Sequence, residues 1–400
     1  MEEDEFKDTE IGRIPKEWEI KTLKDIYTVK YGKSHKKSNN GEIPVIGSSG
    51  IYSYTDIYLA KSDVIIIGRK GNAGKVYFID KNCWPSDTTF YIEPTTLLIS
   101  KFTYYYLYNL NISGNDAKTT LPSLQKGTVE SIILIIPPLE EQKIITYVLS
   151  KIENAIKIQD RIINSLQELK KSMMHKLFTE GIGHTEFKDT EIGRIPKEWD
   201  IFKLEDIAMV FSGNTAPQEE KYFKNGKYPF IRVRHLTKLE NYKYPLKYDL
   251  INDEAVTVLK LRKFKRGSII FPKSGESIKL EKRAILKEDS YIVNHLAVIE
   301  PTKKINNLFL FYYLNTVKTN NYLVGTSMPS LQLSVIKKFL IPIPSPDEQN
   351  RIAYILSAID NIISIEEDRK KYFEALFKTM LNKLMTGQIR VKNLEMREND

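Results

Sequence analysis

The chain has 400 residues, which is too many for one ordinary hydrophobic core, so at least two domains are expected. Its 42% apolar and 28% charged residues are typical of a soluble protein, and no apolar run is long enough to cross a membrane. Cys83 is the only cysteine, which excludes an internal disulfide and a zinc site made of several cysteines. The acidic start, MEEDEFKDTE, lacks the apolar segment of a secretory signal, so a cytoplasmic location is expected.

The net charge of +9 is unevenly distributed along the chain. Residues 20–136 carry +5 and residues 201–342 carry +11, so the remainder carries −7. Two separate basic segments are expected of two surfaces that bind a polyanion such as DNA. A solvated, lysine-rich surface of the kind seen in heat-adapted proteins is the alternative explanation.

A tandem repeat organises the chain. The segment FKDTEIGRIPKEW occurs at residues 6–18 and again at residues 187–199, an offset of 181. At an offset of 207, LPSLQ (121–125) matches MPSLQ (328–332), IPPLEEQ (136–142) matches IPSPDEQ (343–349), and HKLFT (175–179) matches NKLMT (382–386). Each copy therefore has a constant frame around a variable middle, and the second middle is longer by about 26 residues.

The two middles predict mixed α/β structure. Short β-rich runs at residues 63–67, 76–79 and 268–271 alternate with glycine-bearing turns. One short helix is expected before the PSLQ element in each copy, at residues 102–110 and 308–316.

Two loops of the first middle carry residues suited to DNA. Residues 30–37 and 46–56 combine lysines, small hydroxyls and tyrosines, which suits a phosphate grip with groove contacts. In residues 68–75, Arg69 can pair with guanine and Asn72 with adenine. A nucleotide-binding phosphate loop is the alternative there, but its spacing fails because Val76 follows Lys75. The DNA-binding residues predicted in this middle are Lys33, Lys36, Lys37, Ser48, Ser49, Tyr52, Tyr54, Arg69, Lys70, Asn72 and Lys75.

The second middle has its own basic segments. Residues 229–235, PFIRVRH, read as a strand on which two arginines face the same way, although solvated arginines on an edge strand are the alternative. Residues 260–266, KLRKFKR, predict a salt-dependent phosphate grip, and residues 272–279 correspond to 68–75. The predicted DNA-binding residues here are Arg232, Arg234, His235, Lys263, Lys265, Arg266, Lys273, Ser274, Ser277 and Lys279.

The frame of each copy ends in a long predicted helix, at residues 137–180 and 343–388. Each has a proline-containing start with acidic residues in the first turn, followed by apolar residues at alternating spacings of four and three. Such a seam predicts coiled-coil pairing over roughly 57 Å, and two separate amphipathic helices are the alternative. Both seams turn polar at mid-length, which favours one register. The residues predicted to pair the helices are Leu149, Ile152, Ile156, Ile163, Leu166, Leu356, Ile359, Ile363, Phe373 and Phe377.

The expected organisation is an α/β chain with two globular domains and two long helices that pair as a coiled coil. The domains span residues 1–136 and 181–342, the helices 137–180 and 343–388, and a tail 389–400. No GxGxxG, HExxH, GxSxG or nuclease-like carboxylate pattern is present, so no catalytic centre is predicted. The lone histidines His35, His235 and His295 lack partner ligands, so metal binding is not predicted.

Several of these motifs resemble the specificity subunit of type I restriction-modification enzymes. They are G-x-I-P-x-x-W at residues 12–18 and 193–199, the PSLQ element, the P-x-x-E-Q helix starts, IGSSGIYSYTD and PFIRVRHL. The resemblance spans essentially the whole chain. It implies two target-recognition domains, each reading one half of a bipartite, asymmetric DNA site, with the antiparallel helices as a ruler and an internal pseudo-twofold repeat.

The same resemblance implies partners. Two modification subunits would hold S-adenosylmethionine and methylate adenine, and restriction subunits would use ATP and Mg²⁺, so no cofactor is expected in this chain. The alternatives are a self-contained DNA methyltransferase or nuclease, and an adaptor whose basic domains bind nucleic acid or acidic proteins without sequence preference.

Overall fold

The computed structural model describes residues 5–35, 41–94, 99–112, 123–323 and 329–391. These residues form two compact units. The first unit combines residues 1–158 with 371–400, and the second spans residues 159–370, so each unit contains half of both long helices.

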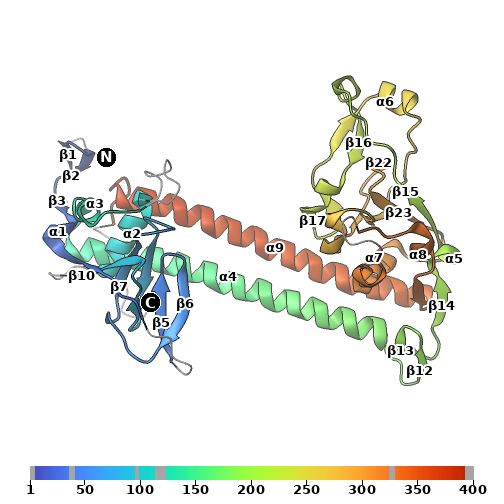
Figure 1. Cartoon of the computed structure of the whole chain (residues 1–400), viewed down its shortest axis with the longest axis horizontal. Coiled ribbons are helices and arrows are strands. Elements are labelled where there is room, and N and C mark those ends of the chain that lie inside the picture. Colours follow the sequence, from blue (N-terminus) through green and yellow to red (C-terminus); the bar gives the residue numbers. More distant parts are fainter. Residues whose placement is uncertain (1–4, 36–40, 95–98, 113–122, 324–328, 392–400) are drawn as a thin grey trace. The chain divides into compact units, whose positions relative to one another are not determined.

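The first domain is the first unit without its long helices, and its described residues form short strands and short helices (Figure 1). Its strands are β1 (Phe6–Thr9), β2 (Gly12–Pro15), β3 (Glu19–Thr22), β4 (Tyr27–Tyr31), β5 (Ile43–Gly47), β6 (Gly50–Thr55), β7 (Val64–Gly68), β8 (Val76–Ile79), β9 (Trp84–Pro85), β10 (Thr89–Pro94) and β11 (Ile133–Ile136). Its helices are α1 (Leu23–Ile26), α2 (Ser100–Leu110) and α3 (Lys126–Glu130), followed by the long helix α4 (Leu139–Thr179).

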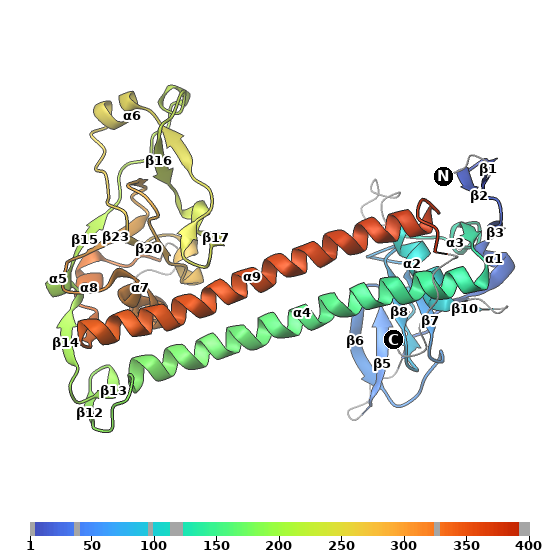
Figure 2. The same ribbon diagram turned by 180° about the vertical axis from the view of Figure 1, so that it is seen from behind.

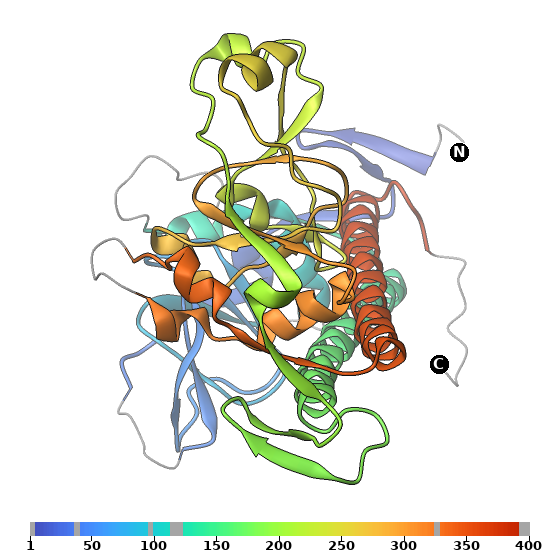
Figure 3. The ribbon, with the colours of Figure 1, turned by 90° about the vertical axis from the view of Figure 1, so that its right-hand side faces the viewer.

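The second domain is the second unit without its long helices. Its strands are β12 (Phe187–Thr190), β13 (Gly193–Pro196), β14 (Asp200–Lys203), β15 (Ala208–Ser212), β16 (Tyr228–Ile231), β17 (Leu239–Glu240), β18 (Tyr244–Pro245), β19 (Asp249–Ile251), β20 (Ile269–Pro272), β21 (Ala284–Ile285), β22 (Tyr291–Ile292), β23 (Leu296–Pro301) and β24 (Leu340–Ile343). Its α-helices are α5 (Leu204–Ile207), α6 (Asp253–Val258), α7 (Asn307–Thr316) and α8 (Leu333–Lys337), and the long helix α9 (Pro346–Met385) follows. Its 3₁₀ helices are η3 (Glu220–Tyr222), η4 (Val233–Leu236), η5 (Glu276–Leu280) and η6 (Thr319–Tyr322). The β12–β13 hairpin after α4 is the green pair of strands in Figure 3.

The two domains share one topology, although their middles barely align in sequence. The sheet β4-β10-β7-β8 of the first corresponds to β15-β23-β20-β21 of the second. The three-stranded sheet β6-β5-β9 corresponds to β19-β16-β22, and in both the central strand pairs in parallel with the last. The frame strands β3 and β11 pair as β14 and β24 do.

Apolar residues of the frame and of the sheets form one core in each unit with the long helices. In the first unit, α2 packs on β7 and β8 and buries Tyr105 and Leu107. In the second, α7 buries Phe309 and Leu310 beside the start of α9 (Figure 2). The short strands and helices expected at residues 63–67, 76–79, 268–271, 102–110 and 308–316 are confirmed, each within one or two residues.

One structural expectation was wrong. Arg232 and Arg234 do not lie on a strand, because β16 ends at Ile231 and the 3₁₀ helix η4 begins at Val233. The imidazole of His235 accepts the backbone N–H of Arg232, so a side chain competes with the strand for this donor and ends it. The two arginines nevertheless reach the same carboxylate, that of Asp249.

The frame motifs meet at the start of each long helix. In the first unit, the indole N–H of Trp18 donates to buried Glu141 at 2.9 Å, and Arg390, which follows α9, bonds the same carboxylate. The equivalent cluster of the second unit joins Trp199, Glu348 and His184, which follows α4. The repeated motifs of the frame therefore encode contacts that tie the start of one long helix to the segment after the other.

The glutamines of the segments IPPLEEQ (136–142) and IPSPDEQ (343–349) complete these helix starts. Gln142 donates to the Pro137 carbonyl, and Gln349 donates to the Pro344 carbonyl. The Gln349 side chain also accepts the backbone N–H of Asn306, the residue that caps α7. The motif therefore holds the proline turn and, in the second unit, the neighbouring helix.

Within each unit, α4 and α9 pack side by side and antiparallel. In the first unit, Ile145 and Leu149 share a core with Leu381 and Leu384. In the second, Ile163 packs on Ile359 and Ile363, with Leu166 and Ile355 beside them. Of the residues predicted to pair the helices, Leu149, Ile163, Leu356, Ile359 and Ile363 are buried, whereas Ile152, Ile156, Leu166, Phe373 and Phe377 are half-buried.

The polar part of the seam pairs across the two helices. Gln159 donates to Glu366, which is its own repeat equivalent at an offset of 207. Asp160 pairs with Lys370 at 2.6 Å and Lys170 with Asp360 at 2.5 Å. A residue that touches its own equivalent marks a local twofold axis between antiparallel helices, so this contact defines their register.

Asp360 is the most buried of these charges. Its side chain is 0% exposed and also meets Lys243, whose side chain is 3% exposed, and the hydroxyl of Tyr312 at 2.6 Å. Burial lowers the pKa of Lys243, and the nearby Asp360 carboxylate opposes that shift. In the first unit, the equivalent Tyr105 donates to Glu153, whose side chain remains 24% exposed.

We expect Glu141→Ala to reduce the free energy of unfolding by about 3–5 kcal/mol, because it leaves the buried Trp18 indole without its acceptor and the Arg390 guanidinium with Glu17 alone. The hydrogen bonds that the Arg390 guanidinium donates to Glu141 contribute most to the raised pKa of Arg390. The control is Glu140→Ala at the neighbouring exposed position, which should cost less than about 0.5 kcal/mol. Chemical denaturation measures both, and equal costs would contradict this role.

We expect Asp360→Asn to cost about 3 kcal/mol or more, because two lysines would then face each other without a carboxylate. The matched control is Glu153→Gln, its partly solvated repeat equivalent, which should cost about 1 kcal/mol or less. The folded-state pKa of Lys243 is below 10.5, so the unfolded chain binds more protons between these two values. Stability should therefore rise with pH across that window, more steeply in Asp360→Asn, and a flat profile would contradict the assignment.

Candidate nucleic-acid interface

Four strands of the first domain end, and a fifth strand begins, at one edge of the domain. Strands β4, β5, β7 and β9 end there, and β10 starts there. We call the residues that follow these ends the first loop edge: residues 32–33, 48–49, 69–74 and 86–88. The segment 86–88 is its hub, because its backbone bonds both the β5 end at Ile46 and the β7 end at Arg69.

The second domain repeats this arrangement with different residues. Its second loop edge consists of residues 213–214, 232–236, 273–275 and 293–295, which follow β15, β16, β20 and β22. The backbone N–H of Val293 donates to Ile231, and that of Lys273 donates to His295. The hub 293–295 thus occupies the place of 86–88, and η4 occupies the place of Ser48 and Ser49.

The PSLQ element supports the loop after the central strand in both domains. Lys70 pairs with Ser123 and Ser274 pairs with Ser330 as isolated β-bridges. Leu124 donates its backbone N–H to Arg69, and Leu331 donates to Lys273. The repeated motif therefore contributes a backbone support to each edge, while its Leu121, Pro122 and Met328 lie outside the described residues.

A glycine follows the first strand of each edge for a steric reason. A Cβ on Gly32 would lie 2.0 Å from the Ser86 carbonyl oxygen, and one on Gly213 would lie 2.2 Å from that of Val293. Neither distance is possible, so only glycine lets these strands approach the hub. The sequence shows both glycines at the repeat offset of 181, and that signal was available without the structure.

The structure gathers several predicted residues of the first middle on the first loop edge. Asn72 donates to the Ser49 hydroxyl at 3.1 Å, which joins two clusters that lie apart in the sequence. Arg69 donates to the Asp87 carbonyl at 2.7 Å and lies over the Tyr31 ring. Ser48 is buried, whereas Lys33, Ser49, Lys70 and Asn72 are exposed.

Other predicted residues of the first middle lie beside this edge. Tyr52 and Tyr54 are exposed on β6, and Tyr52 contacts His35. Lys75 lies over the ring of Tyr77. Lys36 and Lys37 fall outside the described residues.

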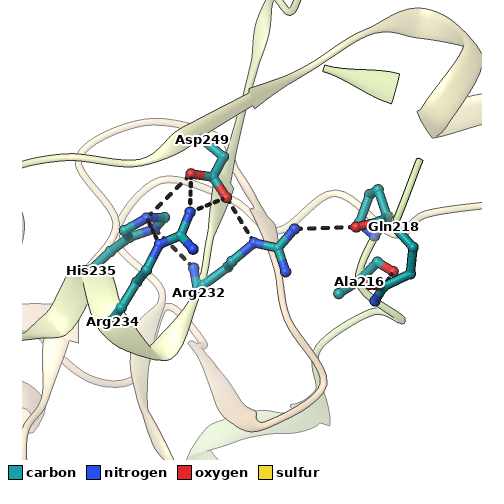
Figure 4. A network of polar contacts seen from close by, with 7 residues as sticks. Ala216, Gln218, Arg232, Arg234, His235 and Asp249 are labelled. Carbon is teal, nitrogen blue, oxygen red and sulfur yellow. Dashed lines mark hydrogen bonds and ion pairs between the residues drawn. The ribbon is translucent and has the colours of Figure 1, made fainter. Parts of the chain in front are cut away.

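An arginine-carboxylate network forms the centre of the second loop edge (Figure 4). Arg232 Nε donates to Asp249 at 2.7 Å, and Arg234 Nη2 donates to both oxygens of that carboxylate at 2.6 and 2.9 Å. Burial raises the pKa of Asp249, but hydrogen bonds from the two guanidinium groups lower it by more than burial raises it. The net pKa of Asp249 is therefore below its ordinary value. Asp249 therefore remains ionised at neutral pH. Sequence reasoning missed it because it lies 15 and 17 residues from its partners.

The imidazole of His235 lies within this network. Its Nδ1 accepts the Arg232 backbone N–H at 3.0 Å, and its Nε2 lies 3.1 Å from Arg234 Nε and 3.5 Å from Asp249. Burial lowers the pKa of His235, so the ring is neutral at pH 7 and adds no charge.

The remaining predicted residues of the second middle divide into two groups. Lys273 and Ser274 belong to the edge, and the Ser274 hydroxyl contacts the exposed His295 at 2.8 Å. The basic run 260–266 meets the edge through the backbone of Arg262, which exchanges two hydrogen bonds with the Asn214 side chain. Of the residues predicted there, Lys263 lies over Tyr228, Lys265 bonds Glu300 through its backbone, and Arg266 bonds Asp289 through its backbone. Lys279 pairs with Glu276 within η5, and Ser277 is half-buried beside it.

The hub residues were also missed from sequence. Asp87 and Asn294 are exposed on equivalent positions of the two hubs, yet neither lies in a basic or glycine-rich run. In the described part of the chain, no three His, Cys, Asp or Glu side chains are arranged to hold a metal ion. None of the described helices is long and apolar enough to span a bilayer. Cys83 is buried, which raises the pKa of its thiol to about 12.

The fold and the two loop edges define a protein with two variable recognition domains on one duplicated helical frame. The family model described as "Type I restriction modification DNA specificity domain" matches residues 15–168 and 196–375. The MjaVIII and MjaIX specificity subunits of Methanocaldococcus jannaschii are 30% and 31% identical over 98% of this chain, and 97% and 98% of their own lengths are covered.

Solved structures share the fold. The type I restriction-modification S subunit from M. genitalium matches with a TM-score of 0.61 and 16% identity over 92% of this chain and 96% of its own. The chain belongs to the family of type I restriction-modification DNA specificity subunits. Its role is recognition of DNA sequence.

We expect Gly32→Ala to destabilise the first domain by about 1–3 kcal/mol, because its Cβ would collide with the backbone of the hub. The control is Gly127→Ala in α3, where a Cβ meets nothing within 4 Å and alanine favours the helix. Thermal unfolding compares them, and the hypothesis fails if Gly32→Ala is as stable as the control.

Proposed function

We propose that each loop edge binds one half of a bipartite, asymmetric DNA site, so that the two domains together read both halves. The observation that carries this proposal is the repeated convergence of strand ends: one topology presents different exposed side chains at the same place twice. A shared backbone with different loops suits two readers of different sequence, because base contacts specify and the scaffold only positions them.

The charges of the described edge residues support this proposal. Lys33, Lys70 and Lys273 can hold phosphates, while Asn72, Ser49 and the Arg234 network offer donors and acceptors for base edges. The basic residues Lys263, Lys265 and Arg266 are exposed outside the edge and suit a salt-dependent phosphate grip.

The long helices would set the spacing of the half-sites. Their register is defined by the Gln159–Glu366 contact and by buried Asp360, so the pair resists sliding. Exposed apolar and aromatic residues on them, such as Tyr354, Tyr372 and Ile365, suit docking of two modification subunits, with restriction subunits joining the full complex. A chain from the solved structure described as "Structural basis underlying complex assembly and conformational transition of the type I R-M system" shares the fold, with a TM-score of 0.58 and 14% identity.

We infer further that the chain is not itself an enzyme and acts in the cytoplasm. S-adenosylmethionine, ATP and Mg²⁺ would bind to the modification and restriction subunits, which would supply adenine methylation and DNA cleavage. The family and the sequence, in which we recognise no catalytic pattern, support this division.

The test is the methylation motif of host DNA. In a strain without other DNA methyltransferases, the chain produced with its modification subunits should yield one bipartite adenine-methylated motif. The double variant Ser49→Ala/Asn72→Ala should alter or abolish only one half of that motif, since both residues lie on the first loop edge. Sequencing of methylated DNA measures this outcome.

This experiment has two controls, one for the site of the substitutions and one for the source of the methylation. Lys61→Ala/Lys81→Ala changes two exposed lysines off the edge and should leave the motif unchanged. The chain produced without modification subunits should give no methylation. Methylation by the chain alone, or changes in both halves of the motif, would contradict the proposal.

A further inference from the structure

We propose that Arg234 reads a guanine in the half-site bound by the second domain, and that Asp249 and His235 hold its guanidinium in the reading position. The inference rests on the proposed function, in which the second loop edge faces DNA. It deepens that function by naming a base and the side chain that selects it.

The two arginines of the network differ in exposure, and this difference assigns their roles. The Arg232 side chain is 24% exposed, bonds Asp249 and the Pro217 carbonyl, and lies over the rings of Phe223 and Phe230. The Arg234 side chain is 66% exposed. Arg232 is therefore the support, and Arg234 is the group that a duplex can reach.

Arg234 is held along one side of its guanidinium. Nη2 donates to both Asp249 oxygens and Nε lies against His235, whereas Nη1 makes no hydrogen bond to any residue that the structure describes. The Nη1 donors and the outward N–H of Nη2 therefore remain for a ligand. Two coplanar N–H donors match the O6 and N7 acceptors of guanine, the commonest specific contact of arginine in the major groove.

Restraint of this side chain favours selective binding. An exposed arginine loses rotamer freedom when a ligand immobilises it, and that loss weakens binding. Bonds to Asp249 and the contact with His235 impose that loss during folding. Asp249 in turn is held by Arg232, so the reading position is determined by the folded domain.

The charge of the network argues against a simple phosphate clamp. Two guanidinium groups share one ionised carboxylate, and His235 is neutral because burial lowers its pKa. The four side chains together carry one net positive charge. A phosphate-binding site needs only positive charge. Here a carboxylate cancels one of the two positive charges and orients Arg234.

The first domain has no equivalent reader at this place. The loop after β5 there consists of Ser48 and Ser49, neither of which is basic. Its nearest guanidinium, that of Arg69, is turned to the Asp87 carbonyl. Guanine selection through this loop is therefore expected only in the second half-site.

The experiment selects DNA from a random duplex library with the complex of the full chain and its modification subunits. Four proteins are compared: wild type, Arg234→Lys, Asp249→Asn and Lys247→Ala. Lysine keeps the charge but lacks the planar fork, and exposed Lys247 is a nearby control outside the edge. The half-site that Ser49→Ala/Asn72→Ala leaves unchanged is assigned to the second domain, and thermal unfolding verifies that each variant folds.

We expect Arg234→Lys and Asp249→Asn to lose guanine preference at the same single position of the second half-site, by roughly 5- to 150-fold. All other positions, and the whole Lys247→Ala motif, should match wild type. A uniform loss of affinity without a change in motif would show a phosphate contact and overturn the inference. An unchanged Arg234→Lys motif, or a second half-site without a G·C pair, would overturn it too, whereas a wild-type complex that selects no motif would refute the proposed function itself.

Discussion

A buried carboxylate in the first turn of each long helix is the interaction on which the rest of the structure depends. Glu141 and Glu348 each accept an indole N–H from the frame tryptophan and also bind the segment that follows the other helix. Because these groups are buried, removal of any one leaves another without a partner at a cost of several kcal/mol. The tryptophan and the glutamate of the frame are therefore the same in both copies, while the residues between them are free to differ.

That freedom is confined to the loops. Both domains use the same order of strands, and backbone bonds from the strand ends to the hub hold each edge regardless of the side chains. Gly32 and Gly213 are sterically required there. Such a scaffold can present Ser49 and Asn72 in one domain and Arg234 in the other without a change of fold.

The two units differ where their long helices meet the domains. In the second unit, the β17–β18 hairpin lies in the longer stretch between β16 and β20 and brings Tyr242 and Lys243 to the helices. The first unit has the equivalent tyrosine-carboxylate pair, Tyr105 and Glu153, but solvent and the lysines Lys101 and Lys157 share the charge there. The extra residues of the second middle therefore add a buried contact between domain and helices as well as loop length.

The sequence alone determined the duplicated frame, the long helices and the seam between them, because periodic apolar residues and repeated motifs are local signals. It also indicated the edge residues Ser49, Arg69, Asn72 and Arg234, because glycine-bearing and basic loops are local as well. The strand expected at residues 229–235 was wrong, since a side-chain acceptor on His235 ended it after Ile231. Only the tertiary structure brought Asp249 to the arginines, joined Asn72 to Ser49 and bonded Arg262 of the basic run to Asn214 of the second loop edge. These contacts join residues distant in the chain, and their formation depends on how sheets pair and strands end, which no local pattern specifies.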